Sequence, residues 1–589
     1  MIDLKAKPFC LSDTDCNWVN QTIAHMSDEE KVGQLFFGIS SSFDEAHLKE
    51  LTGKYHIGGC RYNSAPGAMV RRHNEVLQQS SAIPLFIACN TESGGSNACA
   101  DGTFIGSGIK IGATGEKKYA YALGKMSNEE AAAVGCNMAF APVCDIAYNW
   151  ENTEVISRAF GNDPKQVARM SCEYLKGAHT IDGFACAAKH FPGNGLDFRD
   201  AHLSNNVNGM DLRHWNATYG KVYKALFDKG LEAVMAGHIM LPKVARTLNG
   251  KLKEDDIMMP ATLSPEILNG LLREKLGFNG LVITDASHMV GMTCRMKRAD
   301  MLPRAINAGC DMLLFFNDPD EDFATMLNAY RDGTISEERM REALTRILGL
   351  KAHMGLRRKA KDQIVPSEQA MKQVLGKKEY KDTQKAISDK GITLVKYKDK
   401  DVLPLTPKRY KRIMLVHVKG AESGMTALMK AVGMSGGSPV ELLKKKLEDK
   451  GFEVTVYENP VDKMRRQAEA GQKPDFNLFF AGKSAIADFT SQMDLVITVC
   501  DVASGRPCFG LSKGGGEIPW YVFEVPVIVI GCEAPTMLAD IPQARTYINT
   551  YDSKETTMDA LVEKLMKGPQ AFQGTDPIDS YCGLMDARL

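Results

Sequence analysis

The segment from Lys189 to His202 gathers residue types that could bind a sugar and transfer a proton. A short apolar run ends at Lys189, and a proline and two glycines then turn the chain, because proline fixes φ and glycine adopts positive φ. Asp200 lies two residues before His202, a spacing that lets the carboxylate orient the imidazole. A histidine held in this way donates and accepts protons near neutral pH. An isolated Asp-x-His pair is usually only solvated, but the cationic and turn residues beside this one favour an anion- or sugar-binding site.

These residues need a scaffold, and the first part of the chain alternates short apolar runs with stretches of helical periodicity. The apolar runs are Leu35–Ile39, Ile57–Tyr62, Pro84–Cys89, Met138–Val143, Phe184–Ala188, Ala233–Gly237, Leu281–Thr284 and Asp311–Phe316. The helical patterns include Glu116–Gly135, Pro164–Thr180, Trp215–Lys229, Ser264–Leu276 and Arg298–Ala308. Alternating strands and helices imply parallel pairing, and continuous apolar strands imply burial on both faces. The pattern predicts a TIM-type (β/α)8 barrel.

A second domain is predicted after the barrel. A lysine-rich segment, residues 357–389, has few breaks and is interpreted as a helical linker. The strand and helix alternation then restarts, with strands at Ile392–Lys396, Ile413–Val418, Phe452–Tyr457, Leu495–Val499, Val527–Ile530 and Thr546–Thr550. This pattern predicts an α/β sandwich domain with an open, doubly wound sheet. The expected division is a barrel catalytic domain (residues 1–356), the linker (357–389) and the α/β sandwich domain (390–589).

Polar side chains follow the apolar runs directly, which is where TIM barrels carry their active sites. They are Asn90, Glu92, Asp145, Arg158, Lys189, His190, His238 and Asp285. Asp285 ends the seventh run and faces the predicted barrel mouth, so it is a candidate nucleophile. The alternative is that Asp285 only caps the following helix. The convergence of so many polar residues on one end of the barrel favours a catalytic site.

The same residues carry a family resemblance. Lys189-His190-Phe191-Pro192-Gly193, with Asp200-Ala201-His202 beyond it, resembles the signature of glycoside hydrolase family 3 β-N-acetylglucosaminidases. Five other stretches are similar to that family in the same order: Ile87 to Gly95, Phe140 to Asp145, Arg158 to Gly161, Leu276 to Gly280 and Ala308 to Met312. A barrel followed by an α/β sandwich domain also matches the two-domain members of the family.

The resemblance implies a retaining exo-β-N-acetylglucosaminidase. Asp285 would attack the anomeric carbon and form a covalent aspartyl intermediate, while His202, oriented by Asp200, would protonate the leaving oxygen and then activate water. Most retaining glycosidases instead use two carboxylates about 5 Å apart. By the same analogy, Lys189, His190 and Arg158 would hold the sugar hydroxyls.

Three departures from the family leave the sugar preference open. The family usually has aspartate where this chain has Asn90, histidine at Asn194 and arginine at Ser96. Asn90 remains a predicted substrate-binding residue, and Glu92 is expected to take over part of the sugar contact.

Two alternative functions stay open. One is a glycoside phosphorylase of the same family, because a neutral histidine, unlike a carboxylate, would not repel an incoming phosphate. The other is a non-catalytic carbohydrate-binding homologue, which the changes at Asn90 and Asn194 suggest. The intact set of Asp285, Asp200 and His202 argues against this loss of catalysis.

Composition and charge exclude several classes of protein. The 589 residues contain 72 lysines and arginines and 72 aspartates and glutamates, so we expect no nucleic-acid partner. No apolar run reaches the length of about eighteen residues that a membrane span needs. The first ten residues lack an apolar segment of signal-peptide length, so a cytoplasmic protein is expected. The partner is therefore predicted to be a small carbohydrate substrate, and the sequence does not indicate an oligomeric state.

No metal or other cofactor is expected. The 15 cysteines are an odd number and form no CxxC pair, which favours reduced, buried thiols over a disulfide frame or zinc site. The 12 histidines include no HxxxH or HExxH pair. A glycine-rich stretch, Lys513 to Glu517, lacks the ending of a phosphate-binding loop and is interpreted as a flexible or substrate-covering loop.

Overall fold

The computed structural model describes residues 2–40, 42–420, 438–473, 485–502 and 520–589. The chain forms two compact units, one of residues 1–108 and 116–383 and the other of residues 109–115 and 384–589. The glycine-rich stretch Lys513 to Glu517 lies outside the described residues. Within the described part of the chain, no helix combines the length and the apolar character needed to cross a membrane.

The first unit is built on a closed barrel of eight parallel strands, which confirms the predicted fold class. The strands are β1 (Phe36–Ser40), β2 (Gly59–Tyr62), β3 (Phe86–Cys89), β4 (Met138–Ala139), β5 (Ala185–Phe191), β7 (Ala233–Ala236), β9 (Leu281–Ala286) and β10 (Met312–Leu314). They pair in the order β1-β10-β9-β7-β5-β4-β3-β2. Each of the eight predicted apolar runs contains or overlaps one strand, because these strands are covered on both faces and need apolar side chains throughout.

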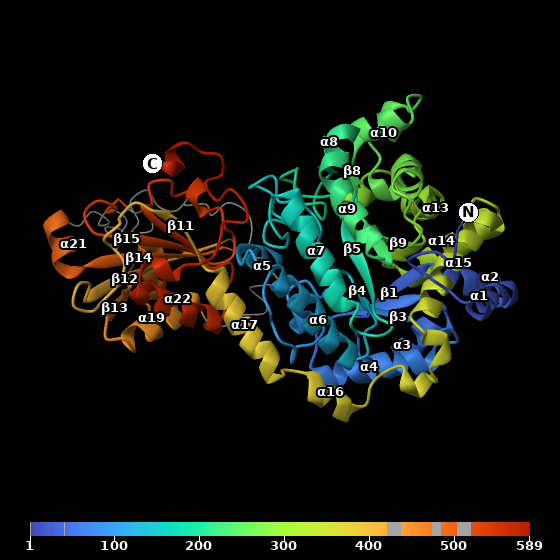
Figure 1. The fold of residues 1–589 in the computed structure, drawn as a ribbon, viewed down its shortest axis with the longest axis horizontal. Coiled ribbons are helices and arrows are strands. Elements are labelled where there is room, and N and C mark those ends of the chain that lie inside the picture. The colour runs from blue at the N-terminus through green and yellow to red at the C-terminus, as the bar shows by residue number, and fades with distance from the viewer. Residues whose placement is uncertain (1, 41, 421–437, 474–484, 503–519) are drawn as a thin grey trace. The chain divides into compact units, whose positions relative to one another are not determined.

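Helices surround the barrel strands (Figure 1). They are α1 (Asp13–His25), α2 (Asp28–Gln34), α3 (Glu45–Gly53), α4 (Gly67–Ser80), α6 (Lys117–Ala133), α7 (Pro164–Ala178), α8 (Leu212–Ala217), α9 (Tyr219–Asp228), α10 (Pro242–Leu248), α11 (Glu254–Ile257), a π-helix (Glu266–Lys275), α12 (Val290–Thr293), α13 (Arg298–Ala308), α14 (Pro319–Arg331), α15 (Glu337–His353) and α16 (Glu368–Val374). A further pair of short strands, β6 (Asn206–Val207) and β8 (Ile239–Met240), lies outside the barrel.

One predicted helix is divided in the structure. The pattern Trp215–Lys229 becomes α8 and α9, which meet at Thr218, where the backbone leaves helical geometry. The Thr218 hydroxyl donates to the backbone oxygen of His214, four residues back. Such a bond offers the backbone an alternative to a continuous helix, and periodicity alone does not reveal it.

The second unit is a six-stranded sheet with helices on it. Its strands are β11 (Thr393–Tyr397), β12 (Arg412–Lys419), β13 (Glu453–Val456), β14 (Leu495–Asp501), β15 (Val527–Gly531) and β16 (Thr546–Asn549). The order is β11-β16-β15-β14-β12-β13, with β11 antiparallel to β16 and the other pairs parallel. Its helices are α19 (Pro439–Glu448), α20 (Pro460–Glu469), α21 (Ile486–Gln492) and α22 (Glu555–Lys567), with α17 (Lys378–Gly391) leading in from the first unit. Two apolar clusters cover the sheet, one of which includes α19 and α22, which lie side by side (Figure 1).

A short segment from early in the chain completes the second unit. Helix α5 (Gly108–Ala113) supplies Lys110, whose buried ammonium donates to Asp552 Oδ2 (2.5 Å) and Thr557 Oγ1 (2.6 Å). The Thr575 N–H donates to the backbone oxygen of Ala113 (2.8 Å). Residues 109–115 therefore belong with a domain whose other residues begin only at 384.

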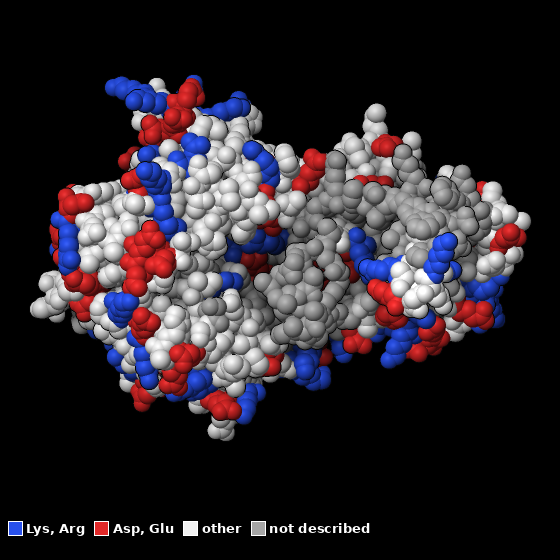
Figure 2. All heavy atoms as spheres, turned by 180° about the vertical axis from the view of Figure 1, so that it is seen from behind, with Lys and Arg blue, Asp and Glu red and all other residues white. Residues whose placement is uncertain are grey.

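Charges of both signs are interspersed on the surface. Figure 2 shows Lys and Arg side chains among Asp and Glu side chains over the described residues of the face that it draws. This distribution agrees with the equal numbers of cationic and anionic residues in the sequence.

Candidate active site

A cavity of about 240 Å³ lies at the carboxyl ends of the barrel strands and contains most of the residues selected from the sequence. Of these, it is lined by Asn90, Arg158, Lys189, His190, His202 and Asp285. A larger groove of about 640 Å³ lies on the outside of the barrel beside α13 and α14. Size does not identify the site here, because the smaller cavity has the convergent titratable groups that a catalytic site needs.

Asp285 lies near the end of β9, and 17% of its side chain is exposed. Its Oδ1 accepts the N–H of Ala286 (2.7 Å), and its Oδ2 lies 4.0 Å from His190 Nε2. Burial raises the pKa of this carboxyl, but the neighbouring His190 and His238, the Ala286 N–H and Lys189 together outweigh burial, so the pKa lies below its ordinary value. Asp285 is therefore ionised at neutral pH, as a nucleophile must be.

His190 is fixed by a buried carboxylate. Its Nδ1 donates to Asp145 Oδ2 (2.6 Å), and its backbone N–H donates to Asp145 Oδ1 (3.2 Å). With the proton on Nδ1, the other ring nitrogen faces the cavity and Asp285. Asp145 also accepts the backbone N–H of Asn194 (2.7 Å), so one carboxylate holds both the strand end and the turn that follows it.

The turn after β5 requires its glycines. Gly193 and Gly195 have φ values of +121° and +102°. A Cβ at Gly193 would lie 2.1 Å from the ring of Tyr219, and one at Gly195 would lie 2.0 Å from the backbone oxygen of Ile146. Only glycine tolerates both the left-handed φ and this close approach.

Three charged residues form a compact group beside the cavity. Glu92 accepts two hydrogen bonds from Arg158, at 2.8 and 2.9 Å, and its Oε1 lies 2.6 Å from Lys189 Nζ. These cations hold the pKa of Glu92 far below its usual range despite burial. Burial lowers the pKa of Lys189, and Glu92 opposes that effect. Both oxygens of Glu92 are occupied by protein cations, which favours a role in holding Arg158 and Lys189 over a direct sugar contact. Lys189 Nζ also donates to Asn90 Oδ1 (3.2 Å).

Asp200 and His202 form the pair that their spacing predicts. Asp200 Oδ1 accepts from His202 Nδ1 (2.7 Å) and from the backbone N–H of His202 (2.8 Å). The hydrogen bond to Asp200 raises the pKa of His202 against the opposing effect of burial. About half of the His202 side chain is exposed (53%), so its free Nε2 can exchange protons with a bound substrate or water.

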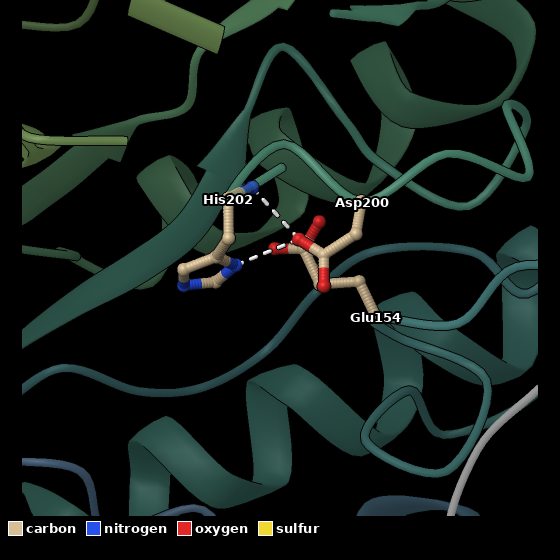
Figure 3. A group of neighbouring side chains, drawn as sticks. All are labelled: Glu154, Asp200 and His202. Carbon is tan, nitrogen blue, oxygen red and sulfur yellow. Dashed lines mark hydrogen bonds and ion pairs between the residues drawn. The ribbon is translucent and has the colours of Figure 1, made fainter. Parts of the chain in front are cut away.

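Glu154 is a part of the site that sequence reasoning missed. Figure 3 shows its carboxylate beside Asp200 and His202. Within the described part of the chain, these three residues are a group whose candidate ligand atoms all lie within 4.8 Å of one another, and carboxylates with an imidazole are common metal ligands. The carboxylates are already engaged by protein donors: Asp200 by His202, and Glu154 by Asn194 Nδ2 (2.8 Å). Glu154 lies in a loop with no motif that would have revealed it.

Two residues of the cavity were absent from the sequence analysis. Arg61, on β2, and His288, just after β9, line the cavity. His238, which the sequence placed after the sixth run, is fully buried, and its Nε2 donates to the backbone oxygen of Ala286 (3.0 Å). His238 thereby fixes the strand end that carries Asp285.

Comparisons with known proteins agree with this geometry. Residues 27–350 match the model of the glycosyl hydrolase family 3 N terminal domain. A Cellulomonas fimi protein named beta-N-acetylglucosaminidase/beta-glucosidase is 36% identical over the full length of both chains. A solved beta-glucoside phosphorylase, BglX, is 36% identical, covers 99% of both chains and has a TM-score of 0.88. A family 3 beta-N-acetylglucosaminidase from a Paenibacillus species shares the fold, with a TM-score of 0.76 over 95% of this chain and all of its own, at 23% identity.

Proposed function

Because the chain belongs to glycoside hydrolase family 3, we propose that it is a retaining exo-β-N-acetylglucosaminidase. One observation carries the proposal: Asp285 and His202 line one cavity, Asp285 as an ionised carboxylate and His202 as an imidazole oriented by Asp200. The first supplies a nucleophile and the second a proton donor, which are the two groups that retaining hydrolysis needs. The name of the Cellulomonas fimi relative supports N-acetylglucosamine as the sugar.

In the first half-reaction, Asp285 attacks the anomeric carbon and the bond to the leaving oxygen breaks. The imidazolium of His202 gives its Nε2 proton to that oxygen, and the negative charge of Asp200 stabilises the imidazolium beforehand. In the second half-reaction, neutral His202 takes a proton from water as the water attacks the anomeric carbon. The ester bond to Asp285 then breaks, and both side chains return to their starting forms.

The cationic residues of the cavity are proposed to hold the sugar. Lys189 and Arg158 are fixed by Glu92, and His190 is fixed by Asp145, so these donors are oriented before the sugar arrives. Such preorganisation lowers the cost of orienting the sugar and favours the reactive geometry. Asn90 adds an amide beside Lys189, where it can meet a sugar hydroxyl.

The nucleophile is tested with Asp285→Ala. We expect kcat/KM for 4-nitrophenyl N-acetyl-β-glucosaminide to fall by about 10⁴-fold or more, as loss of a nucleophile requires. Glu232→Gln is the matched control, because Glu232 is a buried carboxylate at the opposite end of the strands, where it contacts His179 Nε2 (2.7 Å) and accepts the Cys186 N–H (3.0 Å). Full activity of Asp285→Ala would refute the proposal.

A second candidate function is phosphorolysis, in which phosphate replaces water as the acceptor. It is favoured by the full-length similarity to a beta-glucoside phosphorylase and by the cavity lining, which contains three Lys or Arg residues, three histidines and one carboxylate. An anionic acceptor would meet little repulsion there.

The two functions differ in their products. Turnover of the N-acetylglucosaminide and of 4-nitrophenyl β-glucoside should be followed in phosphate-free buffer and then with phosphate. Free sugar released at a rate independent of phosphate supports the hydrolase. A sugar 1-phosphate, released at a rate that rises with phosphate, supports the phosphorylase.

A further inference from the structure

We propose that Glu154 is a positioning residue that fixes the loop of Asp200 and His202 and holds the His202 imidazole in its charged, proton-donating form. The inference rests on the proposed function, because it assumes that His202 is the acid/base. Glu154 lies between β4 and α7, and only 4% of its side chain is exposed. Neither the sequence motifs nor the family resemblance singles it out.

The Glu154 side chain contacts the backbone of the loop that carries Asp200 and His202. The N–H of Ala201, the residue between Asp200 and His202, donates to Glu154 Oε2 at 3.4 Å. The same oxygen accepts from Asn194 Nδ2 at 2.8 Å. Among the described residues, the hydrogen bonds to Asp200 come from the histidine that it orients and from its own loop. The buried carboxylate therefore ties the pair to the rigid turn after β5.

Asn194 supplies the donor that makes this arrangement work. Its Oδ1 accepts from Asn152 Nδ2 (3.3 Å) and Asn206 Nδ2 (3.2 Å), so its Nδ2 must point the other way, towards Glu154. The family usually has histidine at position 194. The asparagine found here was one of the departures that left the sugar preference open in the sequence analysis. The structure assigns the asparagine a partner: Asn194 and Glu154 form the two halves of one buried contact.

Glu154 also acts on His202 through its charge. The negative charges of Asp200, Glu154 and Asp285 all raise the pKa of His202. Burial and the charge on His202 both lower the pKa of two nearby histidines, His238 and His288, which favours their neutral forms. Arg158 Nη1 lies 3.9 Å from Glu154 Oε1 and screens part of its charge. Removing the Glu154 charge therefore lowers the pKa of His202.

Two substitutions separate the effect of the Glu154 charge from the effect of its hydrogen bond with Asn194. Glu154→Gln keeps an oxygen for Asn194 and Ala201 but removes the charge, whereas Asn194→Ala keeps the charge but removes the donor. The readout is kcat/KM of the aryl N-acetylglucosaminide across pH, since its basic limb reports the protonated acid of the free enzyme. We expect Glu154→Gln to move that limb to lower pH by about half to one unit, with several-fold lower kcat/KM above it and near-normal values below it.

Asn194→Ala should lower kcat/KM at every pH without moving the limb. The matched control is Glu232→Gln, a buried carboxylate that also faces a histidine but lies at the other end of the barrel. It should change thermal stability and leave the pH profile unchanged. If Glu154→Gln also leaves the limb in place and only lowers stability, Glu154 is a structural residue and the inference is wrong.

Failure of the inference can be told from failure of the proposed function with His202→Ala. An acid catalyst is needed most when the leaving group is poor. We therefore expect His202→Ala to lose far more kcat/KM on a 4-methoxyphenyl than on a 2,4-dinitrophenyl N-acetylglucosaminide. Equal losses on the two substrates would overturn the acid role of His202 and with it the inference. A leaving-group effect in His202→Ala combined with an unmoved limb in Glu154→Gln overturns the inference alone.

Discussion

Replacing Glu92 with glutamine should damage both the stability and the catalysis of this enzyme. The Glu92 carboxylate accepts contacts of 2.6, 2.8 and 2.9 Å from Lys189 and Arg158, and these are charge-assisted. A glutamine of the same shape can accept with one oxygen only, and its amide group would point N–H bonds at a cation. The substitution therefore removes the anion of a buried charged group and leaves both of its cations, Lys189 and Arg158, in place.

The size of the effect follows from how deeply the cations are buried. Lys189 has 3% of its side chain exposed, and Arg158 has 28%. Breaking a buried pair by removing one partner costs about 3–5 kcal/mol. Arg158 retains Glu154 at 3.9 Å, but burial would act on Lys189 almost unopposed and lower its pKa further. We expect a loss of about 3 kcal/mol in unfolding free energy and a fall of about 100-fold in kcat/KM.

The stability difference should also depend on pH. The pKa of Glu92 in the folded protein lies far below its ordinary value of 4.5, so its stabilising contribution is present above that value and is lost as the pH falls towards the folded-state pKa. The unfolding free energies of wild type and Glu92→Gln should therefore differ fully at pH 7 and converge in acid. Denaturant unfolding at several pH values measures this, and steady-state kinetics at the same pH values measures the catalytic loss.

Glu173→Gln is a suitable control for Glu92→Gln. Glu173, on α7, contacts Lys117 at 3.2 Å, and that lysine is 62% exposed, so the pair should contribute less than about 1 kcal/mol. Glu173→Gln should resemble wild type in both assays. If Glu92→Gln resembles Glu173→Gln, the cations beside the cavity do not depend on Glu92 and the reasoning fails.

Two further outcomes are expected. The buried ammonium of Lys351 contacts Gln34 Oε1 (2.6 Å), and burial lowers its pKa to about 7 from 10.5. The unfolding free energy of the wild type should therefore rise by up to about 1.4 kcal/mol per pH unit above pH 7, until the lysine of the unfolded chain titrates. Denaturant unfolding of Lys351→Met should lack this slope. An unchanged slope would contradict the lowered pKa of Lys351. Asn90→Asp places a carboxylate beside Lys189 Nζ, where a charged acceptor should lower KM for the aryl glycoside about 3–10-fold, and an unchanged KM would show that residue 90 does not meet the sugar.

The architecture could be predicted because strands covered on both faces must be apolar throughout. Runs such as Leu281–Thr284 and Leu495–Val499 therefore begin at the same residues as β9 and β14 and end two residues before them. Strand length was less predictable: of the run Met138–Val143, only Met138–Ala139 belongs to β4, and Val143 forms a separate isolated bridge with Lys189. Apolar composition reports burial but not where hydrogen-bonded pairing stops.

The residues of the candidate site also include some that the sequence could predict and some that it could not. Residues at strand ends, such as Lys189 and Asp285, could be predicted to lie together, because parallel strands of a barrel end at one face. Glu154 could not, since its place depends on how a long loop folds back onto the turn at Asn194. The role of Glu92 was also beyond sequence reasoning, because two cations distant in the chain occupy its carboxylate.

The early segment that completes the second unit has a consequence for synthesis of the protein. Residues 109–115 leave the ribosome long before their partners in the second unit, because residues 116–383 are synthesised in between. Domains generally fold as units while the chain is being synthesised, so the barrel strands can close while α5 is still without its sheet. The ammonium of Lys110 must stay in water until Asp552 is translated, and only then can it be buried at low cost. The second unit is thus assembled from a segment inside the barrel sequence and a segment after it, and the contact of Lys110 with Asp552 forms only near the end of translation.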